Sequence, residues 1–243
     1  MTSSLVGSEM CIRDSTNTVW VGDVKYKDIS GPDGVPDGVI DDYDKTNIGS
    51  PMPKFTFGWT NTFRYKNFDL SVFINGSYGN KVYNYLSMKL THMNSPWTNQ
   101  LNAVNGRAQL VPINPNKVYE DGTMWYNDVS NVMVANPGAS IPRATINDPN
   151  DNDRISDRYI EDGSYIRLKN ISLGYTFPKK TIDKLGLSNL RIYANIQNLL
   201  TITGYDGYDP EIGASTSSVN VYGLDNGRYP SPTVYSFGLN VSF

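Results

Sequence analysis

The chain has 243 residues, a formal net charge of -3 and 12 % aromatic residues, among them 17 tyrosines. A basic patch is the usual mark of nucleic-acid binders, so this charge gives no support to a nucleic-acid partner, and no apolar run approaches the roughly 20 residues of a membrane-spanning helix. A membrane protein built from strands stays open, because every second residue of such a strand is polar.

Residues 4–15 read SLVGSEMCIRDS, which resembles a translated sequencing adapter. We therefore expect residues 1–15 to be a non-native leader and residues 16–243 to be the protein itself; a natural disordered leader is the alternative. The leader holds Cys11, the only cysteine of the chain. It lacks the basic and apolar stretches of a signal peptide, but a truncated reading frame would make that absence uninformative about localisation.

Residues 33–44, DGVPDGVIDDYD, have the spacing of a calcium-binding loop. In such loops, ligands recur at positions 1, 5, 9 and 12, and position 7 supplies a backbone carbonyl. We predict Ca²⁺ binding by the residues at these positions, Asp33, Asp37, Val39, Asp41 and Asp44. Position 3, which normally also supplies a ligand, is Val35 here. The alternative is therefore a solvated turn, in which Asp and Gly occur because of their backbone preferences.

Alternation of apolar and polar residues predicts two strands, at residues 55–65 and 68–79, joined by the tight connection Lys66-Asn67. Side chains two residues apart share a face of a strand. One predicted face is therefore apolar, with Phe55, Phe57, Trp59, Phe63 and Tyr65 followed by Phe68, Leu70, Val72 and Ile74. The other carries Thr, Ser, Gly and charged residues, and the pair is expected to form a hairpin.

The same pattern predicts strands at residues 165–177, 190–200 and 235–243. The last of these ends the chain on Phe243, with Tyr235, Phe237, Leu239 and Val241 on the same face. Chain ends are usually frayed and polar, so we expect this apolar end to be paired into a sheet.

Two long links, at about residues 80–162 and 201–232, alternate with short ones. This alternation is typical of outer-membrane barrels, which have short periplasmic turns and long extracellular loops. We predict an all-β fold: an antiparallel transmembrane β-barrel fragment of about five strands, too few to close, because barrels need at least about eight. A water-soluble β-sandwich is the alternative.

The long links carry aromatic rings among Asn, Asp and Gly, a composition suited to sugar or peptide ligands. We name Trp97, Trp125, Tyr126 and Tyr208 as candidate contacts for a ligand or partner; packing between loops is the alternative. The single histidine, His92, is expected at the surface, and Asp151 and Asp153 are interpreted as solvated loop residues. We find no catalytic constellation and expect no enzyme.

Several motifs together resemble the SusC/RagA family of TonB-dependent outer-membrane transporters. They are the segment from GDVKYKD at Gly22 to the hairpin, YIRLKNISLGYTFP from Tyr165, LRIYANIQNLLTITGYDGYDPEIG from Leu190, and the terminal Phe243. The resemblance implies the C-terminal part of a longer, plugged barrel in the outer membrane of a Bacteroidota-type bacterium. This segment alone would not transport.

The resemblance also implies partners. In the family, a SusD-like surface lipoprotein covers the barrel, TonB supplies energy through the missing N-terminal part, and oligosaccharides or peptides are imported. The C-terminal strand, with Phe243, would be the signal for the barrel-assembly machinery. The alternative function is a secreted calcium-binding β-sandwich or adhesin module.

Overall fold

The computed structural model describes residues 4–5, 13–14, 19–146, 148–212 and 222–243. The chain divides into two compact units, Met1–Ile48 with Asn84–Ile160 and Gly49–Tyr83 with Glu161–Phe243. Cys11 lies outside the described residues. Within residues 1–15, whose status as a leader stays a prediction, Ser4–Leu5 (β1) pairs with Val24–Lys25 (β3) and Arg13–Asp14 (β2) pairs with Val39–Ile40 (β4). None of the helices described is both long enough and apolar enough to span a membrane.

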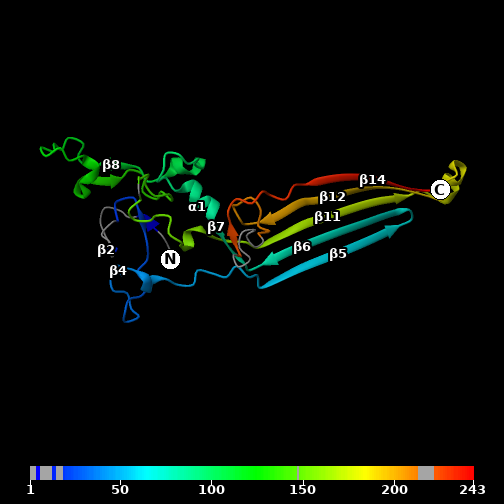
Figure 1. Cartoon of the computed structure of the whole chain (residues 1–243), viewed down its shortest axis with the longest axis horizontal. Coiled ribbons are helices and arrows are strands. Elements are labelled where there is room, and N and C mark those ends of the chain that lie inside the picture. Colours follow the sequence, from blue (N-terminus) through cyan, green and yellow to red (C-terminus); the bar gives the residue numbers. More distant parts are fainter. Residues whose placement is uncertain (1–3, 6–12, 15–18, 147, 213–221) are drawn as a thin grey trace. The chain divides into compact units, whose positions relative to one another are not determined.

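The second unit is built on a five-stranded antiparallel sheet (Figure 1). Its strands lie in the order β14-β12-β11-β6-β5, so the two edges are β14 and β5. The bounds are Phe55–Tyr65 (β5), Phe68–Tyr78 (β6), Tyr165–Thr176 (β11), Asn189–Thr203 (β12) and Val234–Ser242 (β14). All five strands predicted from the alternating pattern are therefore confirmed.

Strand register keeps the predicted apolar residues on one face of this sheet. One row across the five strands consists of Phe63, Leu70, Leu173, Ala194 and Phe237. The adjacent row, on the opposite face, consists of Thr62, Ser71, Ser172, Asn195 and Ser236. The apolar side chains are uncovered: Trp59 is 55 % exposed and Phe237 83 % exposed. We call these two surfaces the apolar face and the polar face.

A β-bulge interrupts the alternation of the sheet in β11 and β12. The register shifts between Leu168 and Asn170, and Asn198 on β12 adopts a left-handed backbone conformation with φ of 53°. Beyond the shift, Leu168 pairs with Leu200 and the apolar pattern resumes on the same face. This change of phase explains why β12 extends past residue 200, where the sequence pattern predicted its end.

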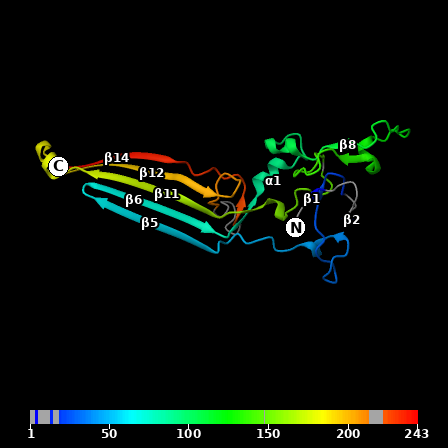
Figure 2. The same ribbon diagram turned by 180° about the vertical axis from the view of Figure 1, so that it is seen from behind.

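The two ends of the sheet differ in their connections. The short links, Lys66-Asn67 and the segment with α2 (Lys179–Ile182) and η6 (Asp183–Leu185), lie at one end together with Phe243 (Figure 2). We call this the turn end. At the other, the loop end, a small sheet forms from Ile160–Asp162 (β10), Lys81–Asn84 (β7) and Leu224–Asp225 (β13).

The first unit contains most of the long link before β11, and this link has structure of its own. The elements of the link are α1 (Tyr85–Thr91), β8 (Leu110–Pro112), β9 (Val132–Val134) and four 3₁₀ turns: η2 (Asn102–Gly106), η3 (Trp125–Asn127), η4 (Val129–Asn131) and η5 (Asp157–Tyr159). The first unit also holds the 3₁₀ turn η1 (Asp42–Asp44), which precedes the sheet. Buried polar groups connect distant segments: Arg143 binds Asp23 through Nε at 2.8 Å and Nη2 at 3.1 Å. Asn152 accepts the Val24 amide at 2.7 Å.

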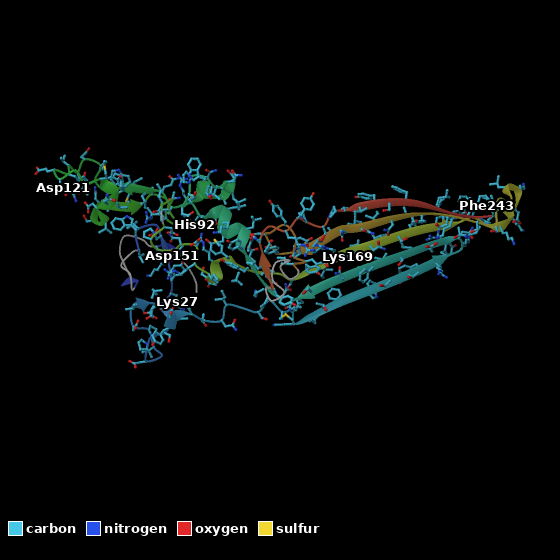
Figure 3. All side chains as sticks on the ribbon, in the orientation of Figure 1. Lys27, His92, Asp121, Asp151, Lys169 and Phe243 are labelled. Carbon is cyan, nitrogen blue, oxygen red and sulfur yellow. The ribbon has the colours of Figure 1, made fainter. Side chains whose placement is uncertain are left out.

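The prediction that His92 lies at the surface is wrong. Its side chain is 8 % exposed, with Nε2 2.7 Å from Asp148 and Nδ1 3.1 Å from Asp153. Figure 3 labels His92 and Asp151, which both belong to the first unit. Both ring nitrogens of His92 therefore face carboxylate oxygens, one from Asp148 and one from Asp153. The interpretation of Asp153 as a solvated loop residue is corrected with it.

Gly174 on β11 makes room for an ion pair on the polar face. Arg191 donates to Asp69 from Nε at 3.1 Å and from Nη2 at 2.6 Å, and a Cβ at Gly174 would collide with both side chains. We expect Gly174→Ala to lower the free energy of unfolding by about 0.5–1 kcal/mol, because the new Cβ would displace the ends of two partly exposed, paired side chains. Denaturant titration of the folded protein measures the change.

Ser172→Ala, two residues earlier on the same face, is the matched control and should change stability little. In an Asp69→Asn background the effect of Gly174→Ala should shrink, because the pair it disturbs is already lost. Equal effects in both backgrounds would contradict this role of Gly174.

Candidate functional site

A polar pocket of about 540 Å³ lies on the polar face at the loop end of the sheet. Thr56 and Tyr165 contribute to it from the strands, and Glu211, Tyr222 and Arg228 from the last long link. Lys169, at the bulge, completes the lining; Figure 3 shows it at the end of the sheet away from Phe243. Hydroxyls, two aromatic rings and charges of both signs therefore meet in one hollow.

A buried arginine holds this site together. Arg167 on β11 donates to Thr201 from Nε at 2.8 Å, to Glu211 from Nη1 at 2.7 Å and to Asp209 from Nη2 at 2.5 Å. Lys169 donates to the same Glu211 oxygen at 2.7 Å. Arg167 is 3 % exposed and Asp209 5 %. An isolated buried charge is costly, so the carboxylates of the last link stabilise Arg167 and Arg167 fixes that link.

Backbone amides complete the shell of Asp209. Its oxygens accept the Glu211 amide at 2.9 Å and the Ser231 amide at 3.0 Å. Burial raises the pKa of Asp209, but the hydrogen bonds from Arg167 and from these amides outweigh it and lower the pKa to about 2. Asp209 is thus charged at neutral pH, and it joins two parts of the last long link to the sheet.

A second buried contact anchors the same link. The Tyr205 hydroxyl donates to Asp225 Oδ2 at 2.5 Å. Asp225 is 1 % exposed and its other oxygen accepts the amides of Gly227 and Arg228. Burial and the adjacent Asp225 carboxylate raise the pKa of Tyr205, so the phenol stays protonated and remains a donor.

Sequence reasoning assigned no role to Arg167, Asp209, Glu211 or Ser231. Their contacts join residues 42 to 44 positions apart, or 22 for Asp209 with Ser231. The only trace in the sequence is a pair of cations, Arg167 and Lys169, in an alternating stretch that has no acidic residue. It indicates that a partner exists but not which carboxylate that partner is.

The four candidate aromatic residues do not line this pocket. Trp97 is 93 % exposed and Tyr208 64 % exposed. Trp125 and Tyr126 contact each other edge to face, with ring centroids 5.7 Å apart. Contact of these four rings with a ligand or partner stays a prediction.

In the predicted calcium loop, the carboxylates bind backbone amides. Asp44 is fully buried and accepts the amides of Ile29 at 2.7 Å, Ser30 at 3.1 Å and Asp41 at 2.9 Å. Burial raises the pKa of Asp44, and these amide bonds more than offset it, so the pKa is lowered. Asp41 caps the Tyr43 amide.

The remaining predicted ligands do not converge. Asp37 accepts the Val39 amide at 2.9 Å and Asp33 is exposed. Among the residues placed by the structure, three acidic or histidine side chains approach a common point only at His92, Asp148 and Asp153. One oxygen of the neighbouring Asp28 is buried without a hydrogen-bond donor from the described chain. Calcium binding by the loop stays a prediction.

The predicted C-terminal signal residues lie on an edge of the sheet. Tyr235, Phe237, Leu239 and Val241 belong to the apolar face of β14, and Phe243 follows the strand and is 94 % exposed. The paired strand that the sequence predicts at this end is therefore present. A role in barrel assembly stays a prediction.

We expect Arg167→Met to detach the last long link from the sheet. It leaves Asp209 buried without its charge partner, and breaking a buried pair in this way costs about 3–5 kcal/mol. Hydrogen exchange at the Glu211 and Ser231 amides, which donate to Asp209, should accelerate by at least two orders of magnitude. Arg228→Met, at an exposed arginine of the same pocket, should leave both amides protected.

The ion pair between Asp209 and Arg167 makes stability depend on pH with a defined sign. Because the folded pKa of Asp209 lies below the ordinary value of 3.8, its contribution is complete above pH 3.8 and is lost as the pH falls through about 2. The Ser231 amide shift should report this titration, with a higher midpoint in Arg167→Met. An unchanged midpoint would contradict the pairing.

For the acidic loop, we expect Ca²⁺ to raise the unfolding temperature, because an ion that binds only the folded state stabilises it. The double variant Asp33→Asn, Asp37→Asn should abolish the increase. Asp121→Asn, in another turn, should retain it. An unfolding temperature indifferent to Ca²⁺ would leave the loop as a backbone-stabilised turn.

The sequence of the chain is similar to those of known TonB-dependent receptors. No family model matches the chain. It is 36 % identical over 211 residues to TonB-dependent receptor P3 of Formosa agariphila, covering 85 % of this chain and 18 % of the relative. It is 29 % identical over 209 residues to TonB-dependent receptor SusC of Bacteroides thetaiotaomicron, covering 85 % and 17 %. None of these relatives is named as an enzyme, in agreement with the sequence prediction.

Comparison with solved structures also finds proteins of this kind. The RagAB peptide importer in its open-open state superimposes with a TM-score of 0.62 at 20 % identity, covering 99 % of this chain and 22 % of that one. The chain thus spans about a fifth of the length of the proteins it matches. Its sheet has the antiparallel transmembrane β-barrel fold of these receptors, as five strands without closure. The chain belongs to the TonB-dependent receptors of the SusC/RagA family.

Proposed function

We propose that this chain is a C-terminal part of an outer-membrane TonB-dependent transporter that imports oligosaccharides or peptides. The separation of the two faces across all five strands is the observation that carries the proposal. Lipid requires an apolar outer face with every backbone group paired within the barrel. The apolar face meets the first requirement, and the edge strands β14 and β5 leave pairing to neighbours supplied by the rest of the receptor.

The polar face then lines the passage. Its loop end carries the pocket of Tyr165, Lys169 and Tyr222, where hydroxyls and rings suit a sugar or a peptide backbone. The buried Arg167 network keeps the last long link in place beside the pocket. Cargo would meet this polar site on entering from the loop side.

The partners follow from the same proposal. The long links would meet a SusD-like surface lipoprotein, TonB would act through a part of the receptor outside this chain, and β14 would be the contact for barrel assembly. RagAB is described as a peptide importer, which supports a peptide or a similar polar oligomer as cargo. Calcium, if bound, would rigidify the acidic loop.

A secreted calcium-binding β-sandwich fits the structure less well. A sandwich needs a second sheet of comparable size packed on the apolar face. The other sheet of the second unit has strands of only two to four residues.

The test is to express the complete receptor gene in a Bacteroidota host and to follow the protein and growth together. We expect the receptor in the outer-membrane fraction, and we expect its deletion to abolish growth on one class of oligosaccharide or peptide. Deletion of the neighbouring lipoprotein gene should give the same growth defect. Phe237→Asp on the apolar face should impair membrane insertion, while Ser236→Asp on the polar face should not. Secretion into the medium would contradict the proposal.

A further inference from the structure

The strands of the five-stranded sheet contain only five charged residues, and one of them forms no ion pair within the described part of the chain. The five are Arg64, Asp69, Arg167, Lys169 and Arg191. Arg167 and Lys169 bind the carboxylates of Asp209 and Glu211, and Arg191 binds Asp69. Arg64 forms no ion pair with any residue that the structure places.

The strand register explains why Arg64 forms no ion pair with the described residues. It lies directly opposite Asp69 on the neighbouring strand. Both oxygens of Asp69 are already bound by Arg191, at 3.1 and 2.6 Å. Gly174, between these two side chains, permits that pairing because it has no Cβ. Asp69, the carboxylate opposite Arg64, therefore accepts hydrogen bonds from Arg191 and interacts with Arg64 only electrostatically.

Arg64 lines a hollow of about 510 Å³ at the turn end of the sheet. The lining also includes Asn67, Thr176, Asp69 and Arg191. Two guanidinium groups face one carboxylate there, which leaves an excess positive charge. Lys66 adds a further cation at the rim, where its ammonium lies 5.3 Å from the Tyr65 ring centroid.

We propose that this hollow binds a carboxylate or phosphate group carried by something outside this chain, with Arg64 as the anchoring residue. The planar guanidinium matches either group through two parallel hydrogen bonds. The side chains of Asn67 and Thr176 supply further donors.

This inference rests on the proposed function, in which the polar face lines the passage. Two sources offer the same chemistry: an acidic group on the transported solute, and an acidic side chain of another segment of the receptor. Both would neutralise Arg64, and both fit the hollow. The experiment separates them.

The test uses the complete receptor, purified from the outer membrane, with Thr62→Cys as the single cysteine. Thr62 precedes Arg64 by two residues on the same face, a distance of about 7 Å. Labelling rates are compared for an anionic sulfonatoethyl and a cationic trimethylammonioethyl thiosulfonate at low salt. We expect Arg64→Gln to lower the anion-to-cation rate ratio roughly tenfold, and Lys180→Gln, at the same end of the sheet, to leave it unchanged.

Citrate and inorganic phosphate are then added as probes. Slower labelling of the wild type, but not of Arg64→Gln, identifies a site for an anionic solute. A cysteine inaccessible to both reagents, with an unfolding temperature lowered by Arg64→Gln but not by Lys180→Gln, identifies a carboxylate of the receptor itself. Both results support the proposal.

An accessible cysteine with a rate ratio indifferent to Arg64→Gln would overturn it. So would an inaccessible cysteine with an unchanged unfolding temperature. Presence of the receptor in the outer-membrane fraction is scored separately, so failure of the anion site is distinguishable from failure of the transporter proposal.

Discussion

The register of β11 with its two neighbours is the constraint on which the rest of the second unit depends. β11 pairs with β6 on one side and β12 on the other, and a shift by one residue would move every side chain to the opposite face. The bulge between Leu168 and Asn170 is accommodated in both ladders, so the apolar face continues from one end of the sheet to the other. Without that common register, neither the polar pocket nor the apolar face would exist.

The bulge also places the charges at the loop end. Arg167 lies on the polar face in regular alternation, and Lys169, at the shift, reaches the same Glu211 oxygen. Two cations thus converge on one carboxylate, and Asp209 takes the remaining arm of the guanidinium. A long link of irregular backbone is thus held on the sheet by side-chain ion pairs and by amide bonds to buried carboxylates.

Charge is unevenly satisfied along the polar face. At the loop end, carboxylates of the last link neutralise the cations of the strands. At the turn end, Asp69 forms its ion pair with Arg191, and Arg64 forms none with the described residues. A polar face that is uncharged except for these residues concentrates the electrostatic field at two places. The first unit uses the same principle with different residues, since Asp23, Asp148 and Asp44 are each buried and each bound by arginine, histidine or backbone amides.

The sequence by itself determined the strands, their faces and the family, because a period of two is a local property that survives without knowledge of the partner strand. It also located the acidic loop, although the Asp44 side chain binds the amides of Ile29 and Ser30, which precede the loop. Tertiary structure alone decided which carboxylates Arg167 binds, that His92 is buried between Asp148 and Asp153, and that Arg64 forms no ion pair with the residues that the structure describes. The physical reason is that the contacts of Arg167 and His92 join segments far apart along the chain. The carboxylates in the loops do not recur with a period that would identify their partners.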